Sequence, residues 1–135
     1  MTHVWPIRVY YEDTDAGGVV YHANYLAYAE RARSEWLRAL GLPHDEVMRR
    51  HGGQWAVHHL AITYRRPARL DDLVEVVTSL EGIGGARVKL RQEIVRAGMV
   101  LASLAVEVAL ITTDGRPLRL PPALRAVMEP ATGAT

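Results

Sequence analysis

Residues 10–33, YYEDTDAGGVVYHANYLAYAERAR, bring together residue types that could act on a carbonyl group. Asp15 and the pair Gly17–Gly18 form an acidic, glycine-bearing turn, and His22 stands just before a segment with helical spacing. The first N–H groups of a helix have no partner within it, and the helix dipole favours negative charge there. Such groups can hold a carbonyl oxygen that is becoming an oxyanion, while a nearby carboxylate activates water or attacks directly. The segment therefore indicates acyl chemistry.

Two pairs of residues suggest a metal site instead, and neither is well placed for one. Asp13 and Asp15 lack the third carboxylate or the several carbonyls that an oxygen-ligand site usually needs. We expect Asp13 to close an Asx turn, and for Asp15 a backbone-capping role stays open beside the catalytic one. His58 and His59 are adjacent on a predicted strand, so their side chains point to opposite faces. One is expected to face the core or an interface, and the other solvent or the mouth of a pocket.

Several other kinds of chemistry have no support in the sequence. The chain has no cysteine, which excludes disulfides, thiolate metal sites and a cysteine nucleophile. It contains no HExxH, GxSxG or Walker motif, and two glycines are too few for a dinucleotide-binding loop. The sequence therefore predicts a site without metal or cofactor.

The long helix that must position these residues is predicted over residues 24–40. Asn24 is expected as its N-cap and Gly41 as its C′ residue. Apolar positions recur at steps of four and three and make one stripe: Tyr25, Ala29, Ala32, Trp36 and Leu40.

The rest of the chain is expected to form one antiparallel sheet. A short helix is predicted within residues 43–52, and a last helical turn near 121–130. Strands are predicted over 4–12, 54–66, 72–83, 86–96 and 99–113. Residues 99–113 are apolar on both faces, as in a central strand. This order predicts an α+β fold in which the sheet curves around one apolar helix.

Composition limits the functional class. The 135 residues suit one domain, and 49% hydrophobic with 23% charged residues is the globular range. A net charge of +1 does not favour nucleic-acid binding. Of the sixteen basic residues only Lys89 is lysine, and the arginine side chain suits phosphate and carboxylate groups. Neither a secretory signal nor a membrane span is visible, so a cytoplasmic location is expected.

The run EDTDAGGVVYHANYLAYAERAR, with its D-x-x-G-V-V-Y-x-x-x-Y core, resembles the 4-hydroxybenzoyl-CoA thioesterase-like branch of the hotdog superfamily. Within that branch it is most similar to the acyl-CoA thioesterases encoded with the Tol-Pal cell-envelope system. RPARLDDLVEV extends the likeness, which covers nearly the whole chain. The resemblance implies a hotdog fold, in which a five-stranded antiparallel sheet wraps one long central helix. It also implies a single domain over 1–130, a flexible tail over 131–135, and a homodimer or homotetramer with sites between subunits.

The same resemblance implies roles for individual residues. Asp15 takes the place of the catalytic carboxylate, as nucleophile or general base, and the His22 backbone N–H that of the donor to the thioester carbonyl. The His22 side chain is expected either to assist or to be structural. Glu30 on the helix is a rival carboxylate whose other explanation is a pair with Arg33. The expected substrate-binding set is Gly18, Val20, Tyr21, Tyr25, His58 and His59, with Arg65, Arg66, Arg69, Arg87 and Lys89 for the phosphates of coenzyme A.

The predicted reaction is hydrolysis of an acyl-CoA thioester to a free acid and CoA. One alternative keeps the fold and changes the substrate to an aromatic acyl-CoA or an acyl-carrier-protein thioester. A second is a non-catalytic acyl-CoA-binding or envelope-complex adaptor. A third, a hotdog dehydratase, is disfavoured because its usual helix-start pattern is absent from the sequence.

Overall fold

Five strands form one antiparallel sheet, and its two edges are the first two strands of the chain. The structure, a computed structural model, describes residues 2–132. The strands are β1 (Thr2–Arg8), β2 (Gln54–Tyr64), β3 (Leu73–Ile83), β4 (Arg87–Arg96) and β5 (Met99–Ile111). Their order in the sheet is β1-β3-β4-β5-β2, so β5 lies inside the sheet and β2 at an edge. The predicted α+β class and antiparallel sheet are confirmed, and so is the interior position of the strand that is apolar on both faces.

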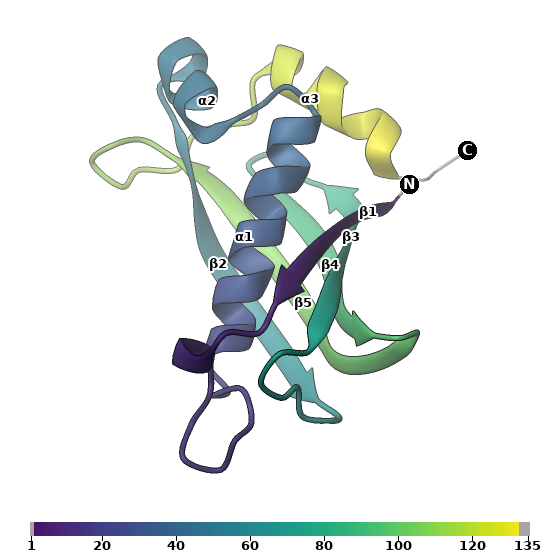
Figure 1. The fold of residues 1–135 in the computed structure, drawn as a ribbon. Coiled ribbons are helices and arrows are strands. Elements are labelled where there is room, and N and C mark those ends of the chain that lie inside the picture. The colour runs from purple at the N-terminus through teal and green to yellow at the C-terminus, as the bar shows by residue number, and fades with distance from the viewer. Residues whose placement is uncertain (1, 133–135) are drawn as a thin grey trace.

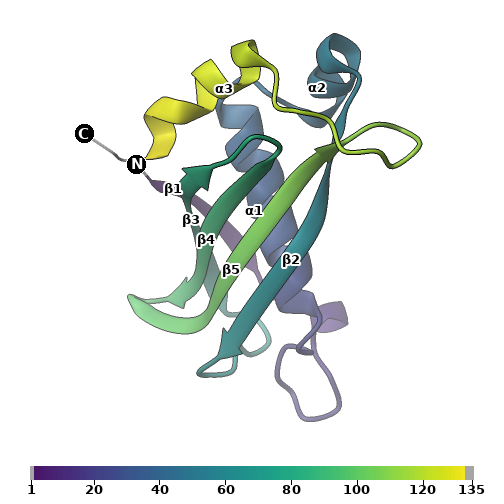
Figure 2. The ribbon, with the colours of Figure 1, turned by 180° about the vertical axis from the view of Figure 1, so that it is seen from behind.

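Helix α1 (Asn24–Ala39) lies across one face of this sheet (Figure 1), and the other face is open to view from behind (Figure 2). The predicted apolar stripe explains why α1 packs on the sheet, because Tyr25, Ala29, Ala32 and Trp36 are all buried in the core. Gly41 follows the helix with a φ of 77°, the left-handed conformation expected at C′. The core therefore lies between α1 and the concave side of the sheet.

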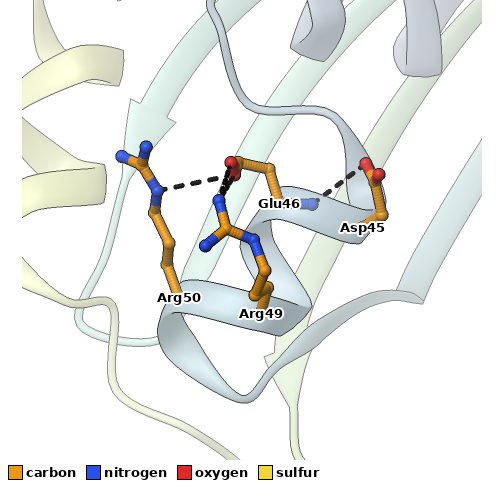
Figure 3. Close-up of polar contacts among 4 residues, drawn as sticks. All are labelled: Asp45, Glu46, Arg49 and Arg50. Carbon is orange, nitrogen blue, oxygen red and sulfur yellow. Dashed lines mark hydrogen bonds and ion pairs between the residues drawn. The ribbon is translucent and has the colours of Figure 1, made fainter.

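The shorter helices gather near the C-terminal end of α1 (Figure 1). They are α2 (His44–His51) and α3 (Pro122–Met128), and the chain also forms 3-10 turns η1 (Tyr11–Asp13) and η2 (Glu129–Thr132). In α2 the Glu46 carboxylate contacts Arg49 and lies 3.5 Å from Arg50 Nε (Figure 3). Residues 133–135 of the expected tail lie outside the described residues, so the expected domain limits stay predictions.

The first strand is shorter than predicted. It ends at Arg8 instead of residue 12, because residues 11–13 turn into η1. The Asp13 carboxylate holds this turn by accepting a hydrogen bond of 2.8 Å from the Tyr10 N–H. Asp13 itself is buried. Burial of Tyr28, and second the neighbouring Asp13 carboxylate, raise the pKa of Tyr28. Asp13 therefore has a structural role, but the expected Asx turn is wrong, because its carboxylate accepts from a preceding N–H and the Asp15 N–H donates to Val19 instead.

Within residues 2–132, no helix has the length and apolar composition needed to cross a membrane.

Candidate active site

The loop between η1 and α1, which contains Asp15, extends beyond the end of the sheet (Figure 1). Thr14 and Val20 form an isolated antiparallel bridge across it. Inside the bridge, the Asp15 N–H donates to the Val19 carbonyl at 2.9 Å, and the Gly18 N–H donates to the Asp15 carbonyl at 3.0 Å. Gly18 has a φ of 78°, a backbone conformation that residues with a side chain rarely adopt. The glycine turn expected from the sequence is therefore confirmed, with Gly18 at its strained position.

The Asp15 carboxylate is exposed on this loop. Its Oδ1 accepts a hydrogen bond of 2.8 Å from the Gly17 N–H, which fixes the direction of the side chain. A Cβ on residue 17 would lie 3.2 Å from the same oxygen, so glycine there leaves room for the carboxylate. Within residues 2–132 the other carboxylate oxygen accepts no hydrogen bond. One oxygen is thus used for positioning, and the second is available to a ligand.

The N–H of His22 is unpaired at the start of α1. Neither it nor the Ala23 N–H donates to any group within residues 2–132. The N-cap is Ala23, which has no side-chain acceptor, so the predicted N-cap at Asn24 is wrong. Asn24 is the first helical residue, and its side-chain amide donates a hydrogen bond of 2.8 Å to the Asp13 carbonyl instead. Free N–H groups at a helix start suit an oxygen that carries negative charge.

Aromatic rings surround the His22 imidazole. Its centroid lies 4.5 Å from the Tyr21 ring and 6.3 Å from the Tyr64 ring. The Tyr64 hydroxyl donates 2.8 Å to the His22 carbonyl, and its ring packs edge-on against Tyr25 at 5.4 Å. Burial, and second the neighbouring Tyr25, raise the pKa of Tyr64, so its hydroxyl stays protonated as a donor. The Tyr25 hydroxyl in turn accepts a hydrogen bond of 2.9 Å from the Ala68 N–H.

These groups border one pocket of about 320 Å³ where the loop, α1 and the end of β2 meet. Six residues of the predicted site line it together: Asp15, Val20, His22, Tyr25, Arg65 and Arg66. The sequence analysis missed three further lining residues: Val19, Tyr64 and Pro67. Tyr64 directly precedes the two arginines at the end of the predicted strand, and this was the one signal that could have found it. One pocket is therefore lined by an aspartate, by a residue whose N–H is unpaired, and by two arginines.

Two predicted residues border this region without lining the pocket itself. Gly18 lies in a neighbouring hollow, which Asp15 also borders, together with Tyr11, Thr14, Ala16 and Leu70. The exposed Tyr21 packs on the His22 ring but is not part of the pocket wall.

His58 and His59 do not reach the pocket. A bulge between Val57 and His59 breaks the strand alternation on which their predicted opposite directions depended. Both histidines are exposed, so neither faces the core of the chain, and the expected alternative, that one faces an interface, stays a prediction. They lie midway along β2, whose outer edge has no neighbouring strand in the sheet.

Arg87 and Lys89 lie at the opposite end of the sheet. Tyr64 pairs with Ala102 of β5, whereas Arg87 pairs with Ala109. Seven residues of strand separate these positions, which is roughly 23 Å. Arg87 instead makes an exposed contact of 3.4 Å with Glu107. Within one chain, these two residues are therefore not part of the candidate site.

The remaining predicted residues also lie elsewhere. Glu30 borders other pockets, and no ion pair joins it to Arg33, so the expected pair is wrong. Arg33 is buried and donates to the Gln92 side chain instead. The Arg69 N–H donates to Asp72 at 2.8 Å, and Arg69 does not line the Asp15 pocket. Among the described residues no three His, Asp or Glu side chains gather as metal ligands.

Comparison with known proteins identifies the family. The model of the thioesterase superfamily matches residues 17–103. This chain belongs to the thioesterase superfamily. The family expected from the D-x-x-G-V-V-Y-x-x-x-Y motif is confirmed, and the matched residues include the start of α1 and the end of β2.

Relatives and solved structures that are similar to this chain agree with this assignment. The chain is 41% identical to the acyl-CoA thioesterase YbgC of Haemophilus influenzae over 123 residues, 90% of each chain. A probable thioesterase from Bartonella henselae is 39% identical with a TM-score of 0.85, over 90% of this chain and 100% of that one. A hypothetical protein from Thermus thermophilus is 33% identical with a TM-score of 0.90, over 97% of this chain and 98% of that one. The hotdog fold is thereby confirmed.

Proposed function

We propose that this protein hydrolyses an acyl-CoA thioester to a free acid and CoA, with Asp15 as the catalytic carboxylate. The observation that supports this most is that Asp15 and His22, whose N–H is unpaired within residues 2–132, line the same pocket. The family and the acyl-CoA thioesterase name of the Haemophilus relative support the same reaction class.

In the proposed reaction the thioester carbonyl oxygen accepts a hydrogen bond from the His22 N–H. The oxyanion that forms is stabilised there by the N–H groups and the dipole of α1. Asp15 removes a proton from water, the water oxygen bonds to the carbonyl carbon, and the C–S bond breaks. The proton then passes to the CoA thiolate. If Asp15 attacks directly, it forms an anhydride that water later opens, with the same products.

Arg65 and Arg66 supply the positive charge of the pocket. Both are exposed, and neither pairs with a carboxylate within residues 2–132. Guanidinium groups bind phosphates through two parallel hydrogen bonds, so we assign the coenzyme A phosphates to this pair. The mechanism uses no metal or redox cofactor.

We also propose that the chain works as a homodimer or homotetramer in the cytoplasm. The outer edge of β2 has eleven residues with no neighbouring strand, and such an edge favours pairing with a second chain. Antiparallel pairing of two β2 strands would bring the sheet end with Arg87 and Lys89 toward the Asp15 pocket of the other subunit. Light scattering should give two or four times the 15.0 kDa chain mass, and a monomer would overturn this part of the proposal.

The Asp15→Asn variant tests the mechanism. Asparagine keeps the Oδ1 acceptor for the Gly17 N–H, so the loop should fold unchanged. Loss of the carboxylate should lower turnover of acyl-CoA at least ~100-fold, the usual contribution of a general base. The control is Asp71→Asn, the same change at an exposed aspartate whose φ of 70° asparagine tolerates. Full turnover by a folded Asp15→Asn protein would eliminate the mechanism.

A further inference from the structure

A second pocket lies between α1, α2 and the start of β2, which we call the α1–β2 pocket. Its volume is about 170 Å³, and it shares no lining residue with the Asp15 pocket. Tyr25 and Arg33 face the two pockets, and eight residues of helix separate them by roughly 12 Å. The apolar wall consists mainly of Trp36, Leu37, Leu90, Val108 and Met128. The proposed reaction gives this pocket no role.

A buried guanidinium lines this pocket, whose polar wall also includes Glu30, Ser34 and His44. Arg33 is 8% exposed, and its one hydrogen bond within residues 2–132 is from Nη1 to Gln92 Oε1, 2.9 Å. No carboxylate of these residues lies within 4.0 Å of it. Burial lowers the pKa of Arg33, and the more distant Glu30 charge opposes that effect. A guanidinium has five N–H groups, so most of its donors have no protein acceptor.

The position of this guanidinium is fixed by a buried amide. Gln92 donates from Nε2 to the Ala29 carbonyl at 2.9 Å and to Thr78 Oγ1 at 3.0 Å. Both bonds require the amide nitrogen on that side, so Oε1 faces Arg33. Arg33 is therefore held in place before any ligand arrives.

Trp55 adds a second donor without an acceptor. Its Nε1 is buried, finds no hydrogen-bond partner within the described residues, and the residue lines the same pocket. A buried donor without a partner is unfavourable, because it has lost its hydrogen bond to water without gaining another. Arg33 comes from α1 and Trp55 from β2, so residues with unused donors from two different elements line one cavity. An anion with acceptor oxygens would satisfy both.

We propose that the α1–β2 pocket binds a small organic acid, with its carboxylate on Arg33 and Trp55 Nε1 and its apolar part against Trp36, Leu90 and Met128. The volume sets the size, because a cavity of about 150 Å³ holds a benzene ring. The ligand is therefore a carboxylic acid with one ring or a short chain. A free acid is also the product of the proposed hydrolysis. That the bound acid is this product rests on the proposed function, whereas the binding site itself does not.

Titration of the full-length protein with benzoate tests the site. Calorimetry should show saturable binding of one benzoate per chain, and neutral benzyl alcohol should bind at least fivefold more weakly. In NMR the indole N–H signal of Trp55, assigned by its absence in Trp55→Phe, should move during the titration. Trp55→Phe should weaken benzoate roughly 2- to 10-fold, the range for one hydrogen bond. The matched control is Trp5→Phe on β1, a tryptophan 37% exposed, which should not change the affinity.

The Arg33→Met variant removes the charge and should abolish the preference for benzoate over benzyl alcohol. If it does not fold, Trp55→Phe alone decides. Asp15→Asn should bind benzoate like the unmodified protein, since Asp15 is outside the pocket. Absence of benzoate binding, equal binding by Trp55→Phe, or loss of binding in Asp15→Asn would each overturn the assignment. None of these measurements needs turnover, so they fail or succeed separately from the proposed function.

Discussion

The Tyr64 hydroxyl donates a hydrogen bond of 2.8 Å to the His22 carbonyl, and so ties the end of β2 to the start of α1. That carbonyl belongs to the peptide unit that carries the Ala23 N–H, one of two unpaired donors at the start of α1. The bond therefore fixes the peptide that follows His22, without involving the substrate carbonyl itself. Tyr64 is a positioning residue in this reading.

Tyr64→Phe should reduce kcat for acyl-CoA roughly 2- to 10-fold while leaving KM almost unchanged. The reason is that one neutral hydrogen bond contributes about 0.5–1.5 kcal/mol, and the oxyanion forms only in the transition state. The control is Tyr11→Phe, a ring 82% exposed on η1. Steady-state kinetics on both variants decides, and an unchanged kcat in Tyr64→Phe would remove the positioning role.

Gly18→Ala should destabilise the protein through the backbone alone. Nothing lies within 4 Å of an added Cβ, but the φ of 78° remains, and a left-handed conformation costs about 1–2 kcal/mol for other residues. The loop can escape this strain by shifting, which would move Asp15 and lower kcat. Gly82→Ala is the matched control, because its Cβ also meets nothing and its φ is not positive. Thermal unfolding should show a lower Tm for Gly18→Ala only, and equal Tm values would refute the strain argument.

Asp72 gives a pH dependence with a defined sign. Burial alone would raise the pKa of Asp72, but hydrogen bonds from the Arg69 N–H and the Arg96 guanidinium outweigh it, so the pKa is lowered. The Arg96 contact is 2.6 Å. A lowered folded-state pKa means that the stabilisation is present above the unfolded value of about 3.9. It is lost as the pH falls through the folded-state pKa.

Asp72→Asn should therefore lower Tm at pH 7 by a few degrees, roughly 1 kcal/mol, and the difference should shrink below about pH 4. Asp71→Asn makes the same change next to it, at a side chain that forms no hydrogen bond within residues 2–132, and should leave Tm unchanged. Thermal unfolding from pH 3 to pH 8 measures both variants. A Tm difference that stays constant over this range would contradict the ionic explanation.

The sequence predicted those parts of the fold where residue spacing alone decides burial. The stripe from Tyr25 to Trp36 and the doubly apolar strand β5 needed only periodicity, and both predictions hold. The predicted end of the first strand is wrong because the Asp13 carboxylate accepts a hydrogen bond from the Tyr10 N–H, a local bond that strand periodicity does not reveal. Asn24 failed as N-cap because its side chain donates to a carbonyl eleven residues away.

Site residues close in sequence to the loop or to the end of β2 were predictable, and distant ones were not. The motif brings Asp15, His22 and Tyr25 together through a single loop and helix start. Arg87 and Lys89 were chosen for charge, and charge does not tell at which end of a strand pair a residue lies. Tyr64 was missed because its role depends on the contact between β2 and α1, which only the folded chain shows.

Replacement of both Arg65 and Arg66 by alanine should weaken the recognition of coenzyme A without affecting the chemical step. A hydrogen bond to a charged group contributes about 1.5–3 kcal/mol, so KM for acyl-CoA should rise roughly tenfold or more while kcat changes little. The same acyl group on N-acetylcysteamine has no phosphates, and its kcat/KM should not change. Added salt should reduce kcat/KM of the unmodified protein more than that of the double variant, because screening weakens the same attraction.

The matched control is alanine at Arg49 and Arg50 of α2 (Figure 3), which removes an equal charge from residues that do not line the Asp15 pocket. Surface ion pairs such as those with Glu46 contribute about 0–1 kcal/mol, so this variant should fold normally. If both double variants raise KM equally, the effect is one of net charge. A rise confined to the Arg65 and Arg66 variant would assign the phosphates to these two side chains. Of the two arginine pairs, only this one borders the pocket that contains Asp15.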